Sequence, residues 1–454
     1  MTIRELTTRF RQGDLSPVEW TRTVLAALPA WQQRTGLMVS WDEERALSEA
    51  RAAEARYRQG NPRGPLDGVL VGLKDLIDRQ GQVTTAGSLW HSATPATEDA
   101  QVTRQLRQAG AHVDLGKLNL HEYAYGPTST SSAFGPVRNP WNSQWMAGGS
   151  SGGSAVAVAS GLMAGAVGTD TGGSIRIPAA FCHVVGLKPS MGRVSTDGVI
   201  PLAWSLDHVG PLARTVEDVA LLWDVLAGPA TASEPIRTPV RIYWPEGPSV
   251  DPDEEDVAHV LRQTVQRLAD ATGAVVERGP LPHVEEIRTA QSIILSVEAL
   301  TYHWPKWLEA PERYQPDVRD RLAAGGDWSA VEYVQAKRYQ NWVKAWYANW
   351  WSAYDVIVLA TVPVAPPPLT ETHLTTRRGR EDVRAVVTRL TNPFNLLGLP
   401  AIAVPAGWTS DGRPVSLQLV AAYGQERALL EIAAIYEAAT GWVHETPPGA
   451  LSLT

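Results

Sequence analysis

The sequence of 454 residues contains a single cysteine, Cys182. One thiol can form neither an internal disulfide nor a zinc site built on several cysteines. Because Cys182 ends the apolar stretch Ala179–Cys182, we expect a small buried side chain there rather than a nucleophile. This cysteine usage fits a chain without redox pressure or in a reducing compartment, and we predict a cytoplasmic protein.

Long hydrophobic runs and an excess of positive charge are also missing. Residues 1–6 lack the apolar core of a secretory signal, and the weakly polar run 155–168 is too short and too rich in small residues to span a membrane. The net charge is −8 at pH 7, so a basic surface for nucleic acid is not expected. Charged residues make up 19% and hydrophobic residues 44% of the chain, which excludes a disordered composition.

Phenylalanine is scarce, with 4 residues, whereas tryptophan occurs 18 times. Trp342, Trp346 and Trp350 recur every four residues in a long helix predicted over about 329–351, so they share one helix face. Two interpretations stay open: a stripe that packs against the core, or the wall of an aromatic-lined pocket.

Short apolar runs alternate with helical segments along the chain. Strands are expected at 69–73, 111–115, 164–168, 239–244, 273–277, 355–360, 401–405 and 415–420. Helices are expected after the N-cap Ser16, over 43–58, 103–109 and 154–162, from the N-cap Asp251 to about 272, and over 426–440. The alternation predicts an α/β fold with a largely covered sheet.

Residues 147–178 form the richest stretch of glycine and serine, with two turns that flank a helix and a strand. In the turn 171–174, successive backbone N–H groups can converge on one point, which suits a developing oxyanion. A phosphate-binding loop would need a lysine after the glycines, and the dinucleotide pattern G-x-G-x-x-G is absent. The stretch therefore favours nucleophilic catalysis by Ser174 over nucleotide binding.

A serine nucleophile needs a base, and the sequence is compatible with either a histidine or a lysine in that role. Ten histidines are present, so a Ser-His-Asp triad is compatible with the composition, although no G-x-S-x-G elbow surrounds Ser174. A lysine base must be neutral, so its pKa must fall by about two to three units. Lys74 ends an apolar run, an environment that disfavours the charged form, but composition alone favours a surface or strand-end lysine at that position.

The chain closely resembles the amidase signature family over nearly its whole length. The resembling elements are GLKDLID (72–78), FGPVRNPWN (134–142), GGSSGGSAVAVASG (148–161), GTDTGGSIRIPAAFC (168–182), VGLKPSMGRVS (185–195), SLDHVGPLARTVEDVA (205–220) and NPFNLLGLPAIAVPAG (392–407). The resemblance implies a single large α/β domain, 1–454, with a mixed twisted sheet covered by helices. Within it, 1–60 would be an N-terminal helical region, 65–225 the catalytic core and 226–454 the part that completes the sheet and pocket.

The resemblance also implies the site residues. Lys74 would be the base, Ser150 the bridging serine and Ser174 the nucleophile of a Ser-Ser-Lys triad, with Ser151 the weaker candidate for the bridge. The remaining expected residues are the oxyanion-hole amides of Thr171, Gly172, Gly173 and Ser174, the supporting Asp170 and Arg176, and the acyl-side loop Ala124, Tyr125 and Gly126. A cis peptide bond is expected before Ser150, and no metal or cofactor is implied.

The expected activity is hydrolysis of a carboxylic acid amide through a Ser174 acyl-enzyme. The alternative is the glutaminase subunit of a tRNA-dependent amidotransferase, and a binding-only member is a third reading. Ile177 stands where the amidotransferase subunits usually carry glutamine, which favours the stand-alone amidase. Tyr125 and the tryptophan-rich helix predict an apolar or aromatic acyl group. We expect a small-molecule amide as partner, neither nucleic acid nor membrane, and we leave a homodimer open.

Overall fold

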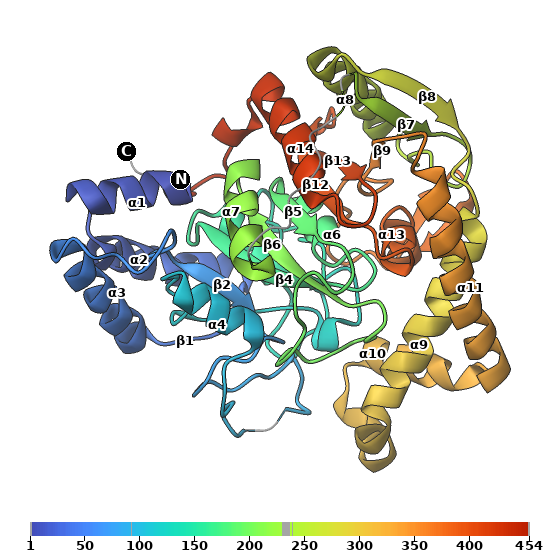
Figure 1. Ribbon diagram of the computed structural model, residues 1–454. Coiled ribbons are helices and arrows are strands. Elements are labelled where there is room, and N and C mark those ends of the chain that lie inside the picture. Colours follow the sequence, from blue (N-terminus) through green and yellow to red (C-terminus); the bar gives the residue numbers. More distant parts are fainter. Residues whose placement is uncertain (1, 92, 229–236, 238, 453–454) are drawn as a thin grey trace.

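The computed structural model describes residues 2–91, 93–228, 237 and 239–452. An eleven-stranded mixed sheet runs through the molecule in the order β1-β3-β2-β4-β6-β5-β12-β13-β9-β7-β8 (Figure 1). Its strands are β1 (Met38–Trp41), β2 (Val71–Lys74), β3 (Gly116–Leu118), β4 (Gly165–Asp170), β5 (Val185–Lys188), β6 (His208–Ala213), β7 (Arg241–Pro245), β8 (Val275–Gly279), β9 (Val356–Ala360), β12 (Ala401–Trp408) and β13 (Pro414–Val420). A separate hairpin joins β10 (His373–Thr376) to β11 (Gly379–Asp382).

The helices of the described residues surround this sheet. They are α1 (Ile3–Gln12), α2 (Pro17–Thr35), α3 (Glu43–Arg58), α4 (Gln101–Gln108), α5 (Gly152–Ala159), α6 (Arg176–Cys182), α7 (Val216–Ala227), α8 (Glu255–Thr272), α9 (Val284–Glu309), α10 (Pro316–Ala324), α11 (Ala330–Trp350), α12 (Val383–Thr388), α13 (Asn392–Leu396) and α14 (Glu426–Thr440). None of them is long and apolar enough to cross a membrane.

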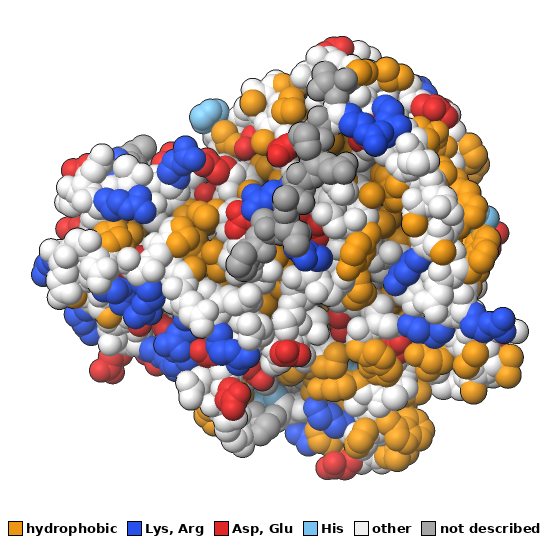
Figure 2. Space-filling view, viewed as in Figure 1, with side chains coloured by type: hydrophobic (Ala, Val, Ile, Leu, Met, Phe, Trp, Pro, Cys, Tyr) orange, Lys and Arg blue, Asp and Glu red, His pale blue; other side chains and the backbone are white. Residues whose placement is uncertain are grey.

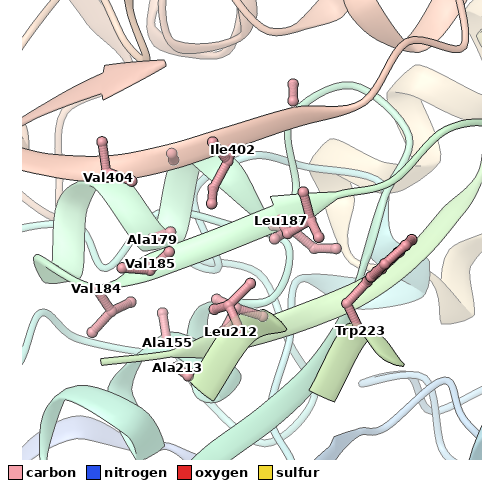
Figure 3. Close-up of a cluster of buried hydrophobic side chains, with 14 of the residues drawn as sticks. Ala155, Ala179, Val184, Val185, Leu187, Leu212, Ala213, Trp223, Ile402 and Val404 are labelled. Atoms are coloured by element: carbon pink, nitrogen blue, oxygen red, sulfur yellow. The ribbon is translucent and has the colours of Figure 1, made fainter. Parts of the chain in front are cut away.

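Two sets of helices cover the central strands. Helix α14 packs on α7 and on α8, and these three helices cover β5, β6, β12 and β13, while α5 and α6 pack together on the same part of the sheet. Strands β4, β5, β6 and β13 are buried at every position, which requires cover on both faces. Part of this core is drawn in Figure 3, where side chains of β6, β5 and β12 meet: Leu212, Val185, Leu187, Ile402 and Val404.

Most of the expected elements are present, and the α/β class with a covered mixed sheet is confirmed. The Ser16 hydroxyl caps α2 in a capping box with Glu19, with Pro17 in the first turn. Helices α3 and α14 have the predicted bounds.

Two expectations at element boundaries are wrong. Residues 111–115 form no strand: this segment has only an isolated bridge at His112, and the strand β3 follows at Gly116. Asp251 does not cap α8, which begins at Glu255, because its carboxylate instead accepts a hydrogen bond from the Gly247 amide (3.1 Å). The side chain therefore closes the preceding turn rather than the helix.

The surface over the lower ends of α9 and α10 carries a group of hydrophobic side chains (Figure 2). Helix α9 exposes Trp304 and Leu308 in its last two turns. The tryptophans of α11 lie elsewhere: Trp350 packs edge-on against Tyr243 of β7, and Trp346 against His283 before α9. Of the predicted stripe, Trp346 and Trp350 therefore pack against the core, whereas Trp342 is half exposed.

Candidate active site

Lys74 lies at the end of β2, where the parallel pairing with β4 sets its neighbours. The register joins Leu73 to Val167, so Lys74 comes beside the last residues of β4. The side chain is fully buried, and its Nζ donates to Ser150 Oγ (2.6 Å) and to Thr169 Oγ1 (2.8 Å). Burial lowers the pKa of Lys74 to about 7, against the opposing charges of Asp170 and Asp207. A lysine with this pKa is available as a base at neutral pH.

The first Gly-Ser turn delivers Ser150 to this lysine. The Gly149–Ser150 peptide bond is cis, as the resemblance implies. The Ser150 carbonyl accepts from the backbone amide of His121 (3.2 Å), which ties the turn to the segment before Tyr125. The neighbouring Ser151 hydroxyl donates instead to the Thr169 carbonyl (3.1 Å), so it faces away from Lys74. The geometry therefore favours Ser150 over Ser151 as the partner of Lys74.

The second Gly-Ser turn carries Ser174 and packs directly against the first. The Ser151 amide donates to the Ser174 carbonyl (3.1 Å), and Ser174 lines a cavity beside the site. Gly173 has φ = 130°, a conformation that glycine adopts far more readily than other residues, and an added Cβ would lie 2.3 Å from Thr391 Oγ1. The turn thus requires glycine at this point.

The expected set of four oxyanion-hole amides needs one correction. The Gly173 amide donates to Asp170 Oδ1 (2.7 Å), so it is not available to a substrate oxygen in this conformation. The amides of Thr171, Gly172 and Ser174 have no acceptor among the described residues. The carboxylate of Asp170, a residue expected only to support the turn, is what withdraws the Gly173 amide.

Asp170 and Arg176 hold the turn through a buried ion pair. The Arg176 guanidinium donates to both carboxylate oxygens of Asp170, and also to Gln418 Oε1 and Asn395 Oδ1, each at 2.7 Å. Arg176 and Lys188 keep the pKa of Asp170 far below its usual range despite burial. This network joins the Ser174 turn to β13 and α13, segments more than 200 residues away in the sequence.

Two further polar residues lie at the site and were not singled out from the sequence. Thr169 bonds Lys74, and Asp207 accepts from the Thr171 hydroxyl (2.6 Å) and from the backbone amides of Leu202 and Ala203. Burial raises the pKa of Asp207 to about 6. Thr169 directly follows the strand predicted at 164–168, so its place in the sequence could have indicated that it lies at the site. Asp207 has no such signal, because only the fold brings it close to Thr171.

A cavity of about 450 Å³ opens beside Ser174. The expected acyl-side residues Ala124, Tyr125 and Gly126 line it together with Ser174, whereas no tryptophan of α11 does. The aromatic-wall interpretation of that helix is therefore wrong for this cavity, and packing is its observed role. A second cavity of about 220 Å³ lies on the other side of Thr171 and reaches Thr169 and Asp207.

Cys182 is a buried structural residue, as expected, and its neighbour His183 also has structural contacts. Burial raises the pKa of the Cys182 thiol far above its ordinary value, which leaves it unreactive. His183 ends α6 in the left-handed conformation, stacks on Trp408 with ring centres 4.4 Å apart, and contacts Glu445 through Nε2 (2.8 Å).

Fold and site together define an α/β protein in which a buried lysine contacts Ser150 beside the glycine-rich turn of Ser174, an arrangement suited to nucleophilic catalysis. Residues 19–430 match the Amidase family. The chain is 35% identical to a glutamyl-tRNA(Gln) amidotransferase subunit of Pseudomonas syringae pv. syringae (strain B728a), with 99% of each chain covered.

Solved structures agree with this match. A crystal structure of an amidase superposes with a TM-score of 0.87 at 36% identity, covering 96% of this chain and 99% of that one. A 6-aminohexanoate cyclic dimer hydrolase complexed with substrate gives 0.86 at 29% identity, with 99% of each chain covered. The chain belongs to the amidase signature family and is an enzyme that acts on amide C–N bonds.

Proposed function

We propose that the protein hydrolyses a small carboxylic acid amide through an acyl-enzyme on Ser174, with Ser150 and Lys74 as the proton relay. The observation that carries the proposal is the buried Lys74, which contacts Ser150 Oγ at 2.6 Å and has a pKa lowered to about 7. A lysine that is neutral at the working pH can accept the proton that a serine hydroxyl must lose.

The proton movements follow from this arrangement. Neutral Lys74 donates to Thr169 and keeps its lone pair for the Ser150 hydroxyl. As Ser174 Oγ bonds to the amide carbon, its proton passes to Ser150 Oγ, and the Ser150 proton passes to Lys74. The carbonyl oxygen becomes an oxyanion that the amides of Thr171, Gly172 and Ser174 stabilise.

Collapse of the tetrahedral intermediate completes the first half of the reaction. The C–N bond breaks, and the proton held by Lys74 returns through Ser150 to the leaving nitrogen, which departs as ammonia or an amine. Water then attacks the Ser174 ester, and the same relay accepts its proton. The acid leaves, and Ser174 Oγ regains a proton.

Three serine variants test the proposal. Ser174→Ala should abolish ammonia release and covalent labelling by a phosphonate, and Ser150→Ala should lower kcat by at least about 100-fold. Ser151→Ala is the matched control, because the Ser151 hydroxyl donates to the Thr169 carbonyl rather than contacting Lys74. The kcat of this variant should fall far less than that of Ser150→Ala. Labelling of Ser174→Ala by the phosphonate would reject Ser174 as the nucleophile.

A second candidate function is the glutaminase step of a tRNA-dependent amidotransferase, favoured by the likeness to the Pseudomonas amidotransferase chain. An assay of the purified single chain with simple aliphatic amides distinguishes the two functions. Ammonia release from these amides supports the stand-alone amidase. Activity limited to glutamine, and seen only with partner subunits, would establish the alternative.

A further inference from the structure

The cavity beside Ser174 is lined by many charged side chains as well as by apolar ones. Its lining includes five arginines, namely Arg288, Arg321, Arg378, Arg384 and Arg389. It also includes three acidic residues, namely Glu285, Glu381 and Asp382. The lining therefore carries an excess of two positive charges, although the whole chain is negative.

Three of the arginines are already paired. Arg288 contacts Glu285 (3.0 Å) and Arg384 contacts Asp382 (2.6 Å). Arg389 binds Glu381 (2.6 Å) and, behind the lining, Asp253. These pairs account for the acidic residues of the cavity.

Arg321 and Arg378 have no carboxylate within ion-pair distance among the described residues. The exposed Arg378 stands at the turn of the β10–β11 hairpin, and its guanidinium donates to the Pro248 carbonyl. The partly buried Arg321 extends from α10 into the cavity lining. Asp317, one turn before Arg321 on α10, binds His121 Nε2 (3.0 Å) instead. The unpaired positive charge of the cavity thus lies on these two arginines.

Arg321 is held against the loop that adjoins the catalytic serines. Its Nη1 donates to the Tyr125 carbonyl (2.8 Å), and its guanidinium carbon lies 4.1 Å from the centre of the Tyr125 ring. Arg321 also makes a side-chain hydrogen bond with Tyr125, and none of its N–H groups has a carboxylate acceptor among the described residues. A planar guanidinium fixed in this way presents a pair of donors suited to a carboxylate.

From these contacts we propose that the acyl part of the substrate carries a carboxylate, which Arg321 binds inside the cavity while Arg378 adds positive charge at the rim. The inference rests on the proposed function, because an acyl-enzyme keeps the acyl group attached to Ser174 within this cavity. The substrate class is then the monoamides of dicarboxylic acids. It replaces the apolar or aromatic acyl group expected from the sequence.

Matched pairs of amides test the substrate class. Succinamate and glutaramate are compared with butanamide and pentanamide, in which a methyl group replaces the carboxylate. We expect kcat/KM to be about 10- to 100-fold higher for the carboxylates, the range of a charge-assisted hydrogen bond, and the preference to shrink with added salt. Equal or higher kcat/KM for the neutral amides would overturn the inference.

Substitutions of the arginines test whether Arg321 is the source of the carboxylate preference. Arg321→Gln should remove most of the carboxylate preference, mainly through KM, and Arg321→Lys should retain part of it. Arg377→Gln is the control, because Arg377 is an exposed neighbour of Arg378 that contacts Glu255 (3.3 Å) and does not line the cavity. A preference that survives Arg321→Gln unchanged would overturn the assignment.

Inhibition provides a readout that needs no variant. Glutarate should inhibit hydrolysis of pentanamide competitively and about 10-fold more strongly than pentanoate does. Equal inhibition by the two acids contradicts the inference while leaving the proposed function intact. If no amide is hydrolysed and Ser174 is not labelled by a phosphonate, the proposed function itself has failed.

Discussion

The pH dependence of kcat/KM tests the buried lysine directly. Burial lowers the pKa of Lys74 from 10.5 to about 7, which is equivalent to about 5 kcal/mol in favour of the neutral form. A base with pKa 7 is about one-tenth neutral at pH 6, half neutral at pH 7 and nine-tenths neutral at pH 8. Because the neutral form is the active one, kcat/KM should rise about tenfold between pH 6 and pH 8 and then level off.

The profile is measured with an uncharged amide, so that the substrate itself does not titrate. Asp207→Asn should move the acid limb to lower pH, since the negative charge of Asp207 raises the pKa of Lys74. Asparagine keeps an acceptor oxygen for Thr171. Lys344→Gln is the control, because burial also lowers the pKa of Lys344 but this lysine does not line the cavity. The acid limb of the pH profile should not shift in this variant.

Two results would refute this reasoning. A limb that continues to rise tenfold per unit through pH 9 would mean that the base keeps the ordinary pKa of lysine. An acid limb that moves to higher pH in Asp207→Asn would mean that the titrating group is not a cation in the field of this carboxylate. Either outcome would remove Lys74 as the base that operates at neutral pH.

Three further substitutions probe the supporting geometry. Thr169→Val removes an acceptor from the base and should lower kcat about tenfold with little change in KM, as measured by ammonia release. Gly173→Ala brings a Cβ to 2.3 Å from Thr391 Oγ1 at φ = 130°, and should cost about 2 kcal/mol or more of unfolding free energy in urea titrations. Arg176→Met leaves the Asp170 carboxylate buried and unpaired, and should cost about 3–5 kcal/mol in the same assay. Unchanged stability in either of the last two variants would contradict the packing described for the turn.

The sequence predicted the segments that are local in origin. Capping residues define the start of α2, and short apolar runs locate most of the central strands, because cap chemistry and burial act over a few residues. The prediction of a strand at 111–115 was wrong because pairing with β2, rather than apolar content, decides where β3 begins. Ser150 came from family resemblance alone, since its contact with Lys74 depends on two segments 76 residues apart.

The charge of the cavity could not be predicted, for a related reason. Its arginines come from α9, α10, the β10–β11 hairpin and α12, and none lies within a recognisable motif. Most of them are neutralised by acids from neighbouring segments, so a count of charges along the chain does not reveal which ones remain free. The two glycine-serine turns are specified by one continuous stretch, whereas the charged residues of the cavity are assembled from segments of the C-terminal half. For this reason the sequence indicates the class of reaction, whereas the acyl group has to be inferred from side chains that only the fold brings together.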